Sequence, residues 1–235
     1  MDQLNFVEIG AKLGMFFVPF LFALCFHEFS HGWVAKLRGD DTAERAGRLS
    51  LNPLVHADVI GTWVLPISAI LFGSPFFFGW AKPVPVVAER LGHPRRDMML
   101  VGAAGPGLNL IMAAIAALVL GIVLRPYGAV QEPSGVIGFI VLNLFNFISI
   151  NVFLALFNLL PIPPFDGSHI VEGLLPMPLA RGYAKFRPVG MLIPLVLIVV
   201  LPNLIPGFSV TQYIVGPVEW VINWYARLAG LVAGV

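Results

Sequence analysis

The chain has 235 residues, of which 58% are hydrophobic and only 11% are charged, and its formal net charge at pH 7 is +1. A soluble domain carries about 25% charged residues, so this composition excludes a disordered chain, a nucleic-acid-binding protein and an ordinary soluble globule. The single cysteine, Cys25, excludes an internal disulfide, and we expect it to pack within its apolar run. The composition predicts a multi-pass integral membrane protein.

The first apolar run covers residues 13–35 and predicts a transmembrane helix of 23 residues. At about 1.5 Å per residue the helix would be roughly 35 Å long, which is enough to cross the hydrocarbon core. The preceding residues lack the basic region of a signal peptide, so we expect the span to be retained. Its only strongly polar residues lie within His27-Glu-Phe-Ser-His31.

Residues 59–80 are apolar enough to span, but Pro66, Gly73 and Pro75 interrupt them. In the stretch that follows, Pro83 and Pro85 alternate, so both missing N–H groups fall on one edge of an extended strand. The other edge would stay open for pairing. We therefore predict a re-entrant segment that leads into a strand, and irregular backbone at membrane depth should line a site.

Two further apolar runs, residues 98–124 and residues 136–160, predict a second and a third span. Residues 190–201 and 210–235 are weaker and close the bundle as one or two spans. Prolines interrupt their apolar pattern at Pro194, Pro202 and Pro206.

The predicted fold is thus an all-α polytopic membrane protein, a bundle of about five transmembrane helices with a re-entrant or strand segment near residues 59–87. We expect a single membrane-embedded domain over residues 1–235. Its core would cover residues 10–175, and its C-terminal helices would lie within residues 189–235.

The basic residues favour the re-entrant interpretation of residues 59–80. If this segment returns to its own side, eleven of the fourteen Lys and Arg share one side of the membrane, whereas a full crossing leaves no bias. The positive-inside rule makes that side cytoplasmic, so we expect the active-site loops there, in a bacterial or archaeal cell membrane. The eleven residues are Lys36, Arg38, Arg45, Arg48, Lys82, Arg90, Arg95, Arg96, Arg181, Lys185 and Arg187.

His27-Glu28-Phe29-Ser30-His31 has the form H-E-x-x-H. Residues four apart share one face of a helix, so both imidazoles can reach one zinc ion and Glu28 can reach a zinc-bound water. Two structural histidines would also fit the pattern, but ionisable groups within a span are costly and usually functional. The motif therefore predicts a metal-dependent hydrolase.

A third ligand must come from elsewhere, because the metzincin extension H-x-x-G-x-x-H is absent. Val34 stands where that extension has its glycine, three residues after His31. Most acidic residues lie in basic loops. Asp166 instead ends an apolar span after three prolines, which stop the helix and leave an extended stretch with free carbonyls. A carboxylate held there is expected to face the interior.

Together, the H-E-x-x-H motif and Asn158-x-x-Pro161-x-x-x-x-Asp166-Gly167 resemble the site-2 protease family of intramembrane metalloproteases. Ala104-Gly-Pro-Gly-Leu-Asn109 is similar to the small-residue span of that family. The resemblance covers roughly residues 10–175 and is to a small form with no room for an inserted PDZ domain.

This resemblance implies one zinc ion per chain, with His27, His31 and Asp166 as ligands and Glu28 as the catalytic base. Asn158 and Asn109 are similar to family positions near the site and are candidates for an oxyanion hydrogen bond or a substrate contact. The topology agrees independently, because the two ligand-bearing ends meet only after an odd number of crossings. The span at residues 98–124 alone supplies one crossing.

We therefore expect an intramembrane zinc endopeptidase that cleaves within or near transmembrane segments of protein or peptide substrates in the lipid bilayer. The shielded backbone of such a substrate must unwind, and the open edge near residues 81–87 could hold it by β-augmentation. A metal-ion transporter using the same ligands and an inactive membrane chaperone are the alternatives. Glu28 favours catalysis over both.

Overall fold

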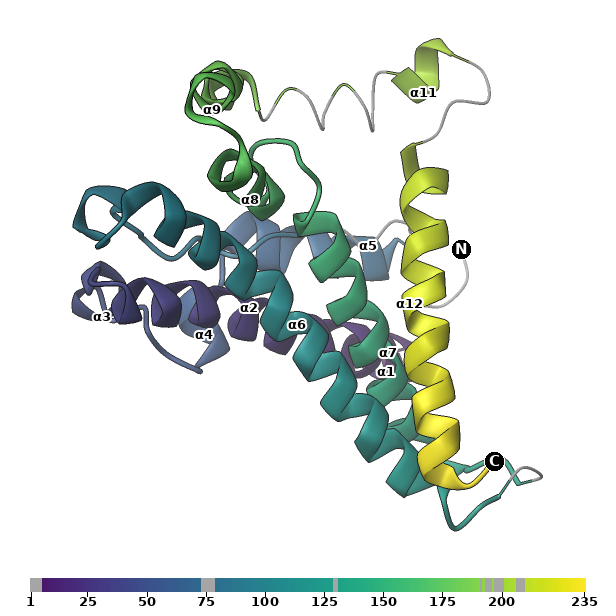
Figure 1. Cartoon of the computed structure of the whole chain (residues 1–235). Helices are drawn as coiled ribbons and strands as arrows, with labels where there is room; N and C mark the ends of the chain where they lie inside the picture. Colours follow the sequence, from purple (N-terminus) through teal and green to yellow (C-terminus); the bar gives the residue numbers. More distant parts are fainter. Residues whose placement is uncertain are drawn as a thin grey trace.

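Figure 1 shows the computed structural model of the chain, which describes residues 6–72, 79–128, 131–190, 192, 196, 201–205 and 210–235. Helices dominate these residues. In chain order they are α1 Phe6–Lys12, η1 Leu13–Phe17, α2 Val18–Leu37, α3 Thr42–Arg45, α4 Pro53–His56, η2 Val59–Val64, α5 Leu65–Leu71, η3 Ala88–Arg90, α6 Pro94–Leu124, α7 Gly135–Asn158, α8 Asp166–Leu174, α9 Met177–Ala184, η4 Arg187–Val189, α11 Leu201–Leu204 and α12 Val210–Ala233.

Three helices are long and apolar enough to cross a membrane, at Ile9–Leu37, Pro94–Leu124 and Gly135–Asn158. They confirm the three stronger spans expected from the sequence. The expected total of about five stays a prediction, because no other helix of the described residues meets both criteria. Most of residues 190–201 lies outside the described residues, whereas α12 is a continuous helix of 24 residues with Pro217 inside it.

Helix α6 lies at the centre of the bundle and packs against α2, α7, α8 and α12. Small residues let the other helices approach it closely. A Cβ atom on Gly121 would lie 2.5 Å from the carbonyl oxygen of Ala229 in α12, for example. The main apolar core therefore forms where α6, α7 and α12 meet, and in Figure 1 α12 runs beside these two helices, away from α3 and α4.

The segment after α4 enters the bundle and returns, as the charge distribution predicts. Its apolar helical part, Val59–Leu71, is shorter than the roughly 20 residues that a span requires. Trp80 donates its backbone N–H to the Gly61 carbonyl at 3.1 Å, and Ala57 pairs with Ala81 in an antiparallel bridge. The two ends of the segment therefore lie together, which agrees with a segment that returns to its own side of the membrane. Gly73 and Pro75, two of its expected breaks, lie outside the described residues.

Residues 81–87 are extended but do not form a regular strand, because the pairing is limited to the single bridge at Ala81 among the described residues. Two donors on the edge opposite the prolines are also already used. Lys82 donates its N–H to the His56 carbonyl at 2.8 Å, and Val84 donates to the Glu28 carboxylate at 2.8 Å. The chain's own acceptors therefore use two of the donors that were expected to be free.

Candidate metal centre

Three groups able to bind a metal converge between α2 and the start of α8. His27 Nε2 lies 3.0 Å and His31 Nε2 lies 3.4 Å from Asp166 Oδ2. Among the described residues these three side chains form the group whose ligand atoms all lie within 4.8 Å of one another. Both histidines are buried, with 5% and 9% of their surface exposed. The structure thus brings together the three residues that the sequence analysis named as ligands.

The contacts of the two Nδ1 atoms, which face away from Asp166, determine where each imidazole carries its proton. His27 Nδ1 lies 2.6 Å from Asn109 Oδ1, and His31 Nδ1 lies 2.7 Å from the Val101 carbonyl oxygen. Neither oxygen can donate, so a hydrogen bond requires the proton to sit on each Nδ1. The Nε2 atoms of the neutral rings then carry lone pairs directed at Asp166, as metal-binding histidines require.

This arrangement fits a cation. Asp166 Oδ2 is buried and receives no hydrogen bond from the described residues, although two imidazole nitrogens face it. Three lone pairs at such distances repel one another unless a positive ion lies between them. Two imidazoles and one carboxylate are a donor set that suits zinc and leaves a fourth tetrahedral position open.

The absence of a side chain at Gly105 makes room for the two imidazoles. A Cβ atom there would lie 2.6 Å from ring atoms of both His27 and His31, including His31 Nε2. At Gly102, one turn earlier in α6, a Cβ atom would lie 3.0 Å from the Asp166 carbonyl oxygen. The small residues of α6 therefore act at the site itself as well as between helices.

Glu28 lies on α2 beside the ligands and is held by the extended segment that follows the re-entrant loop. Its Oε2 accepts the backbone N–H of Val84 at 2.8 Å. Val84 stands between two prolines, so its N–H is the one donor of that tripeptide. This bond occupies one carboxylate oxygen and orients Glu28 without involving Oε1.

A second carboxylate, Asp40, anchors the far end of the same segment. It is fully buried and accepts the Val87 N–H at 2.6 Å and the Thr42 N–H at 3.1 Å, as well as the Thr42 hydroxyl. Burial raises the pKa of the Asp40 carboxyl, but these hydrogen bonds and the nearby Arg90 outweigh it and hold the pKa below its ordinary value. Asp40 therefore stays ionised and ties residues 81–87 to the end of α2.

The two asparagines named from the sequence lie in different surroundings. Asn109 is fully buried, and its amide contacts His27. Asn158 is partly buried and donates its side-chain N–H to the Leu154 carbonyl of its own helix at 2.9 Å. An oxyanion role for either residue stays a prediction.

Sequence reasoning missed Gly105 as a site residue, as well as the Val84 N–H and Asn151. The Asn151 amide contacts Asn109. Asn151 is one of four asparagines in the largely apolar α7, and the available clue was that an amide buried in such a helix needs partners. The sequence alone does not show that the partner of Asn151 is Asn109, which lies 42 positions earlier in the chain.

The chain matches peptidase family M50 over residues 15–201. It is 36% identical over 184 residues to a Bacillus subtilis protein named "Putative zinc metalloprotease YwhC", a match that covers 77% of this chain and 78% of that protein. It is 31% identical to a Mycolicibacterium smegmatis protein named "Putative zinc metalloprotease Rip2", covering 76% of this chain and 64% of that protein.

A Mycobacterium tuberculosis protein also named Rip2 is 30% identical over 183 residues. This chain spans about two thirds of the Rip2 proteins, with 64% and 66% of their lengths covered. No solved structure matches the chain. Because the family match covers most of the chain and includes both motifs, the protein belongs to peptidase family M50, the site-2 protease family of membrane metalloproteases.

Proposed function

We propose that the protein is an intramembrane zinc endopeptidase that hydrolyses peptide bonds within or near transmembrane segments of other membrane proteins. The observation that carries this proposal is the convergence of His27, His31 and Asp166 around an orphaned carboxylate oxygen, beside Glu28. Two of these ligands belong to a helix long and apolar enough to span. Membership of a metalloprotease family agrees with this chemistry.

The charges of the site suit a membrane interior. Two neutral imidazoles, the Asp166 carboxylate and ionised Glu28 together carry two negative charges, which one divalent ion neutralises. A bound zinc ion would supply Lewis acidity, lowering the pKa of a coordinated water to about 7 and polarising the scissile carbonyl. The three ligand side chains hold that ion and leave one position for water or substrate.

Glu28 is the proposed general base. With Oε2 fixed by the Val84 N–H, Oε1 is the oxygen that takes the proton from the attacking water. Glu28 then returns this proton to the leaving nitrogen of the cleaved peptide bond. The Val84 contact lowers the cost of ordering the side chain during the reaction, because the carboxylate is oriented beforehand.

A substrate helix must unwind to expose its scissile carbonyl. Lys82 and Val84 already donate within the chain, but the carbonyls of Pro83 and Pro85 are further pairing groups of this segment. These carbonyls accept no hydrogen bond from the described residues. We propose that an unwound substrate donates its own N–H groups to these oxygens, so that pairing is one-sided.

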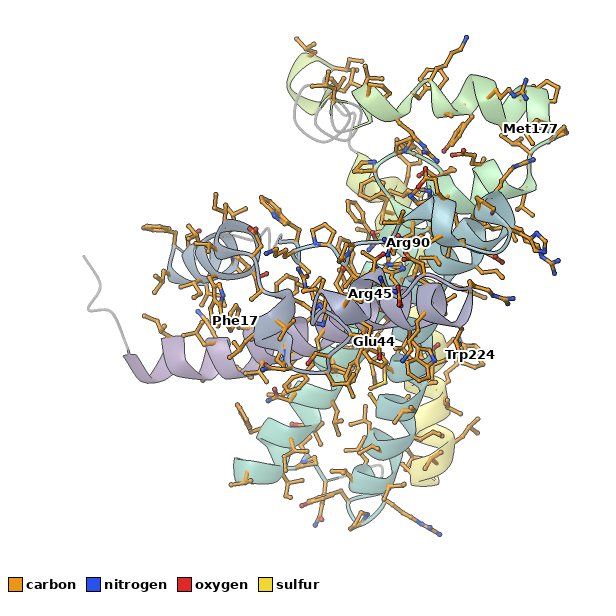
Figure 2. All side chains as sticks on the ribbon, turned by 90° about the vertical axis from the view of Figure 1, so that its left-hand side faces the viewer. Phe17, Glu44, Arg45, Arg90, Met177 and Trp224 are labelled. Carbon is orange, nitrogen blue, oxygen red and sulfur yellow. The ribbon has the colours of Figure 1, made fainter. Side chains whose placement is uncertain are left out.

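We propose that the end of the bundle bearing this site faces the cytoplasm of a bacterial or archaeal cell. Charged side chains gather there, and Figure 2 shows Glu44, Arg45 and Arg90 close together and apart from Phe17. Arg45 pairs with Asp41 at 2.6 Å, and Lys36 pairs with Glu44 at 2.7 Å. An excess of basic residues near the ends of spans is typical of cytoplasmic loops.

The test is cleavage of single-span reporter proteins in liposomes by wild type, Glu28→Gln and Glu44→Gln, with zinc content measured on all three. Glu44 is an exposed glutamate in a surface ion pair and serves as the matched control. We expect wild type and Glu44→Gln to cleave within the span. Glu28→Gln should retain about one zinc ion per chain and lose cleavage.

Cleavage by Glu28→Gln at the wild-type rate would contradict the role of the base. Zinc bound by all three proteins without cleavage of any reporter in a broad panel would favour a chaperone. Zinc movement across the liposome membrane would favour a transporter. Failure of the wild-type protein to hold zinc would overturn the assignment of the three ligands.

A further inference from the structure

We propose that Asn151, a residue of α7 outside both sequence motifs, is a positioning residue for His27 and acts through Asn109. This inference rests on the proposed metal site. Both asparagines are completely buried, and their amides join in a single chain of hydrogen bonds that runs from the backbone of α7 to an imidazole of α2. Each bond in that chain has one allowed direction.

The first step fixes the amide of Asn151. Its Nδ2 lies 2.8 Å from the carbonyl oxygen of Phe147, one turn earlier in α7. A carbonyl only accepts, so the amide nitrogen must face it. The oxygen of Asn151 is thereby directed across the bundle towards α6.

The second step fixes the amide of Asn109. Its Nδ2 donates to Asn151 Oδ1 at 2.7 Å and to the Ala23 carbonyl of α2 at 3.2 Å. Both partners are acceptors, and the bond to Asn151 is the shorter. With both N–H groups of Asn109 committed, its oxygen is left to face His27.

The third step fixes the tautomer of His27. Asn109 Oδ1 lies 2.6 Å from His27 Nδ1, so the proton sits on Nδ1 and the Nε2 lone pair faces Asp166. If the Asn109 amide turned over, its NH₂ group would face Nδ1 and favour the tautomer with a proton on Nε2. A protonated Nε2 cannot bind a metal ion.

His31 shows why this relay is needed at His27. The outer nitrogen of His31 donates to a backbone carbonyl, that of Val101, and a backbone oxygen cannot exchange places with a nitrogen. His27 instead depends on a side-chain amide, whose two ends have nearly the same shape. Asn151 and the Ala23 carbonyl, which both accept from Asn109 Nδ2, determine which end of the amide faces His27.

A purely structural role is the competing explanation, because buried asparagines also hold membrane helices together. The two roles separate in the affinity for zinc. The experiment measures zinc affinity by competition with a chelator, and the melting temperature without metal, on the full chain in detergent. The matched control is Asn146→Leu, since Asn146 also lies on α7 and donates to a backbone carbonyl, that of Met15, at 3.0 Å.

We expect Asn109→Leu to lower zinc affinity about 10–100-fold, as removal of a partner of a ligating histidine typically does. Asn151→Leu should lower it less, about threefold to tenfold, because Ala23 still accepts from Asn109. In this buried position a protonated Asn151→Asp side chain keeps an acceptor for Asn109 and an O–H donor for the Phe147 carbonyl, so this variant should retain the affinity. Asn146→Leu should leave zinc affinity unchanged, whatever it does to melting.

The decisive comparison uses Asn109→Asp. Either oxygen of an aspartate can accept from His27, so the orientation of residue 109 no longer matters. In that background Asn151→Leu should therefore cause no further loss of zinc affinity. An equal loss in both backgrounds, or no loss in the wild-type background, would overturn the proposal.

His27→Ala separates this inference from the metal site itself. If His27→Ala keeps the wild-type zinc affinity, then the proposed ligands are wrong, and the hydrogen bonds from Asn151 through Asn109 to His27 cannot position a metal ligand. If His27→Ala loses zinc and Asn151→Leu does not, then the site stands and only the relay is wrong. Should Asn151→Leu fail to fold, Asn151→Asp and Asn151→Ser decide the matter, because only the aspartate is expected to retain wild-type affinity.

Discussion

Glycines serve different purposes in the two halves of α6. In the half that begins at Pro94, Gly102 and Gly105 make room for Asp166 and for the two imidazoles, and Asn109 bonds to one of them. In the outer half, Gly121 makes room for the backbone of α12, and the surroundings are apolar. One helix therefore combines a chemical site with a packing seam, and a missing side chain is functional in the first and structural in the second.

Gly105→Ala should give the largest effect. The added methyl group would lie 2.6 Å from ring atoms of His27 and His31, so the imidazoles would have to leave the positions in which they could hold a metal ion. We expect at least a 100-fold loss of zinc affinity and of cleavage, about 3 kcal/mol or more at 1.4 kcal/mol per tenfold. Chelator competition and reporter cleavage measure these losses.

Gly107→Ala is the control in the same turn, because a Cβ atom there would meet nothing within 4 Å. It should behave as wild type. Normal zinc binding by Gly105→Ala would contradict the crowding at the site and with it the contrast between the two halves of α6.

Gly121→Ala should act on folding and not on zinc. Its Cβ atom would lie 2.5 Å from the Ala229 carbonyl oxygen and 2.6 Å from Val232 Cβ, so α12 must shift. Overpacking of this kind costs about 1–3 kcal/mol of unfolding free energy. Denaturation in detergent measures that cost, and zinc affinity should stay within about twofold of wild type. A large loss of zinc affinity would show that the two halves are coupled.

The smallest effect concerns the extended segment over residues 81–87, which holds Glu28 beside the metal ligands. Because its folded pKa lies below the ordinary value of 3.8, the Asp40 carboxylate stabilises the fold at neutral pH. That contribution is complete above the ordinary value and is lost as the pH falls through the folded value.

Asp40→Asn should therefore destabilise the protein by about 1–2 kcal/mol near neutral pH and should flatten the loss of stability in acid. Melting temperatures in detergent from pH 3 to pH 7 measure both changes. Asp41→Asn is the control, since the partly exposed Asp41 bonds an exposed arginine and lies outside the Asp40 contacts with Val87. An unchanged pH profile for Asp40→Asn would contradict the proposal that the Asp40 carboxylate anchors residues 81–87.

Short-range patterns determined much of this protein. The composition and three apolar runs established a membrane bundle, and the i,i+4 spacing placed His27 and His31 on one face, because helix periodicity is a local property. The bias of basic residues indicated that residues 59–80 return to their own side of the membrane, and the bridge between Ala57 and Ala81 agrees with that interpretation. Asp166 could be named because it belongs to a second motif whose helix runs in the required direction.

Only the tertiary structure decided how distant groups meet. The Val84 N–H was expected to be free, yet it lies on Glu28, 56 positions away, and Asn151 reaches His27 through Asn109 on a third helix. The sequence marks such groups as buried and in need of partners, but not which partners they have. That choice depends on how closely the helices approach, and the absence of side chains at glycines such as Gly105 sets that distance.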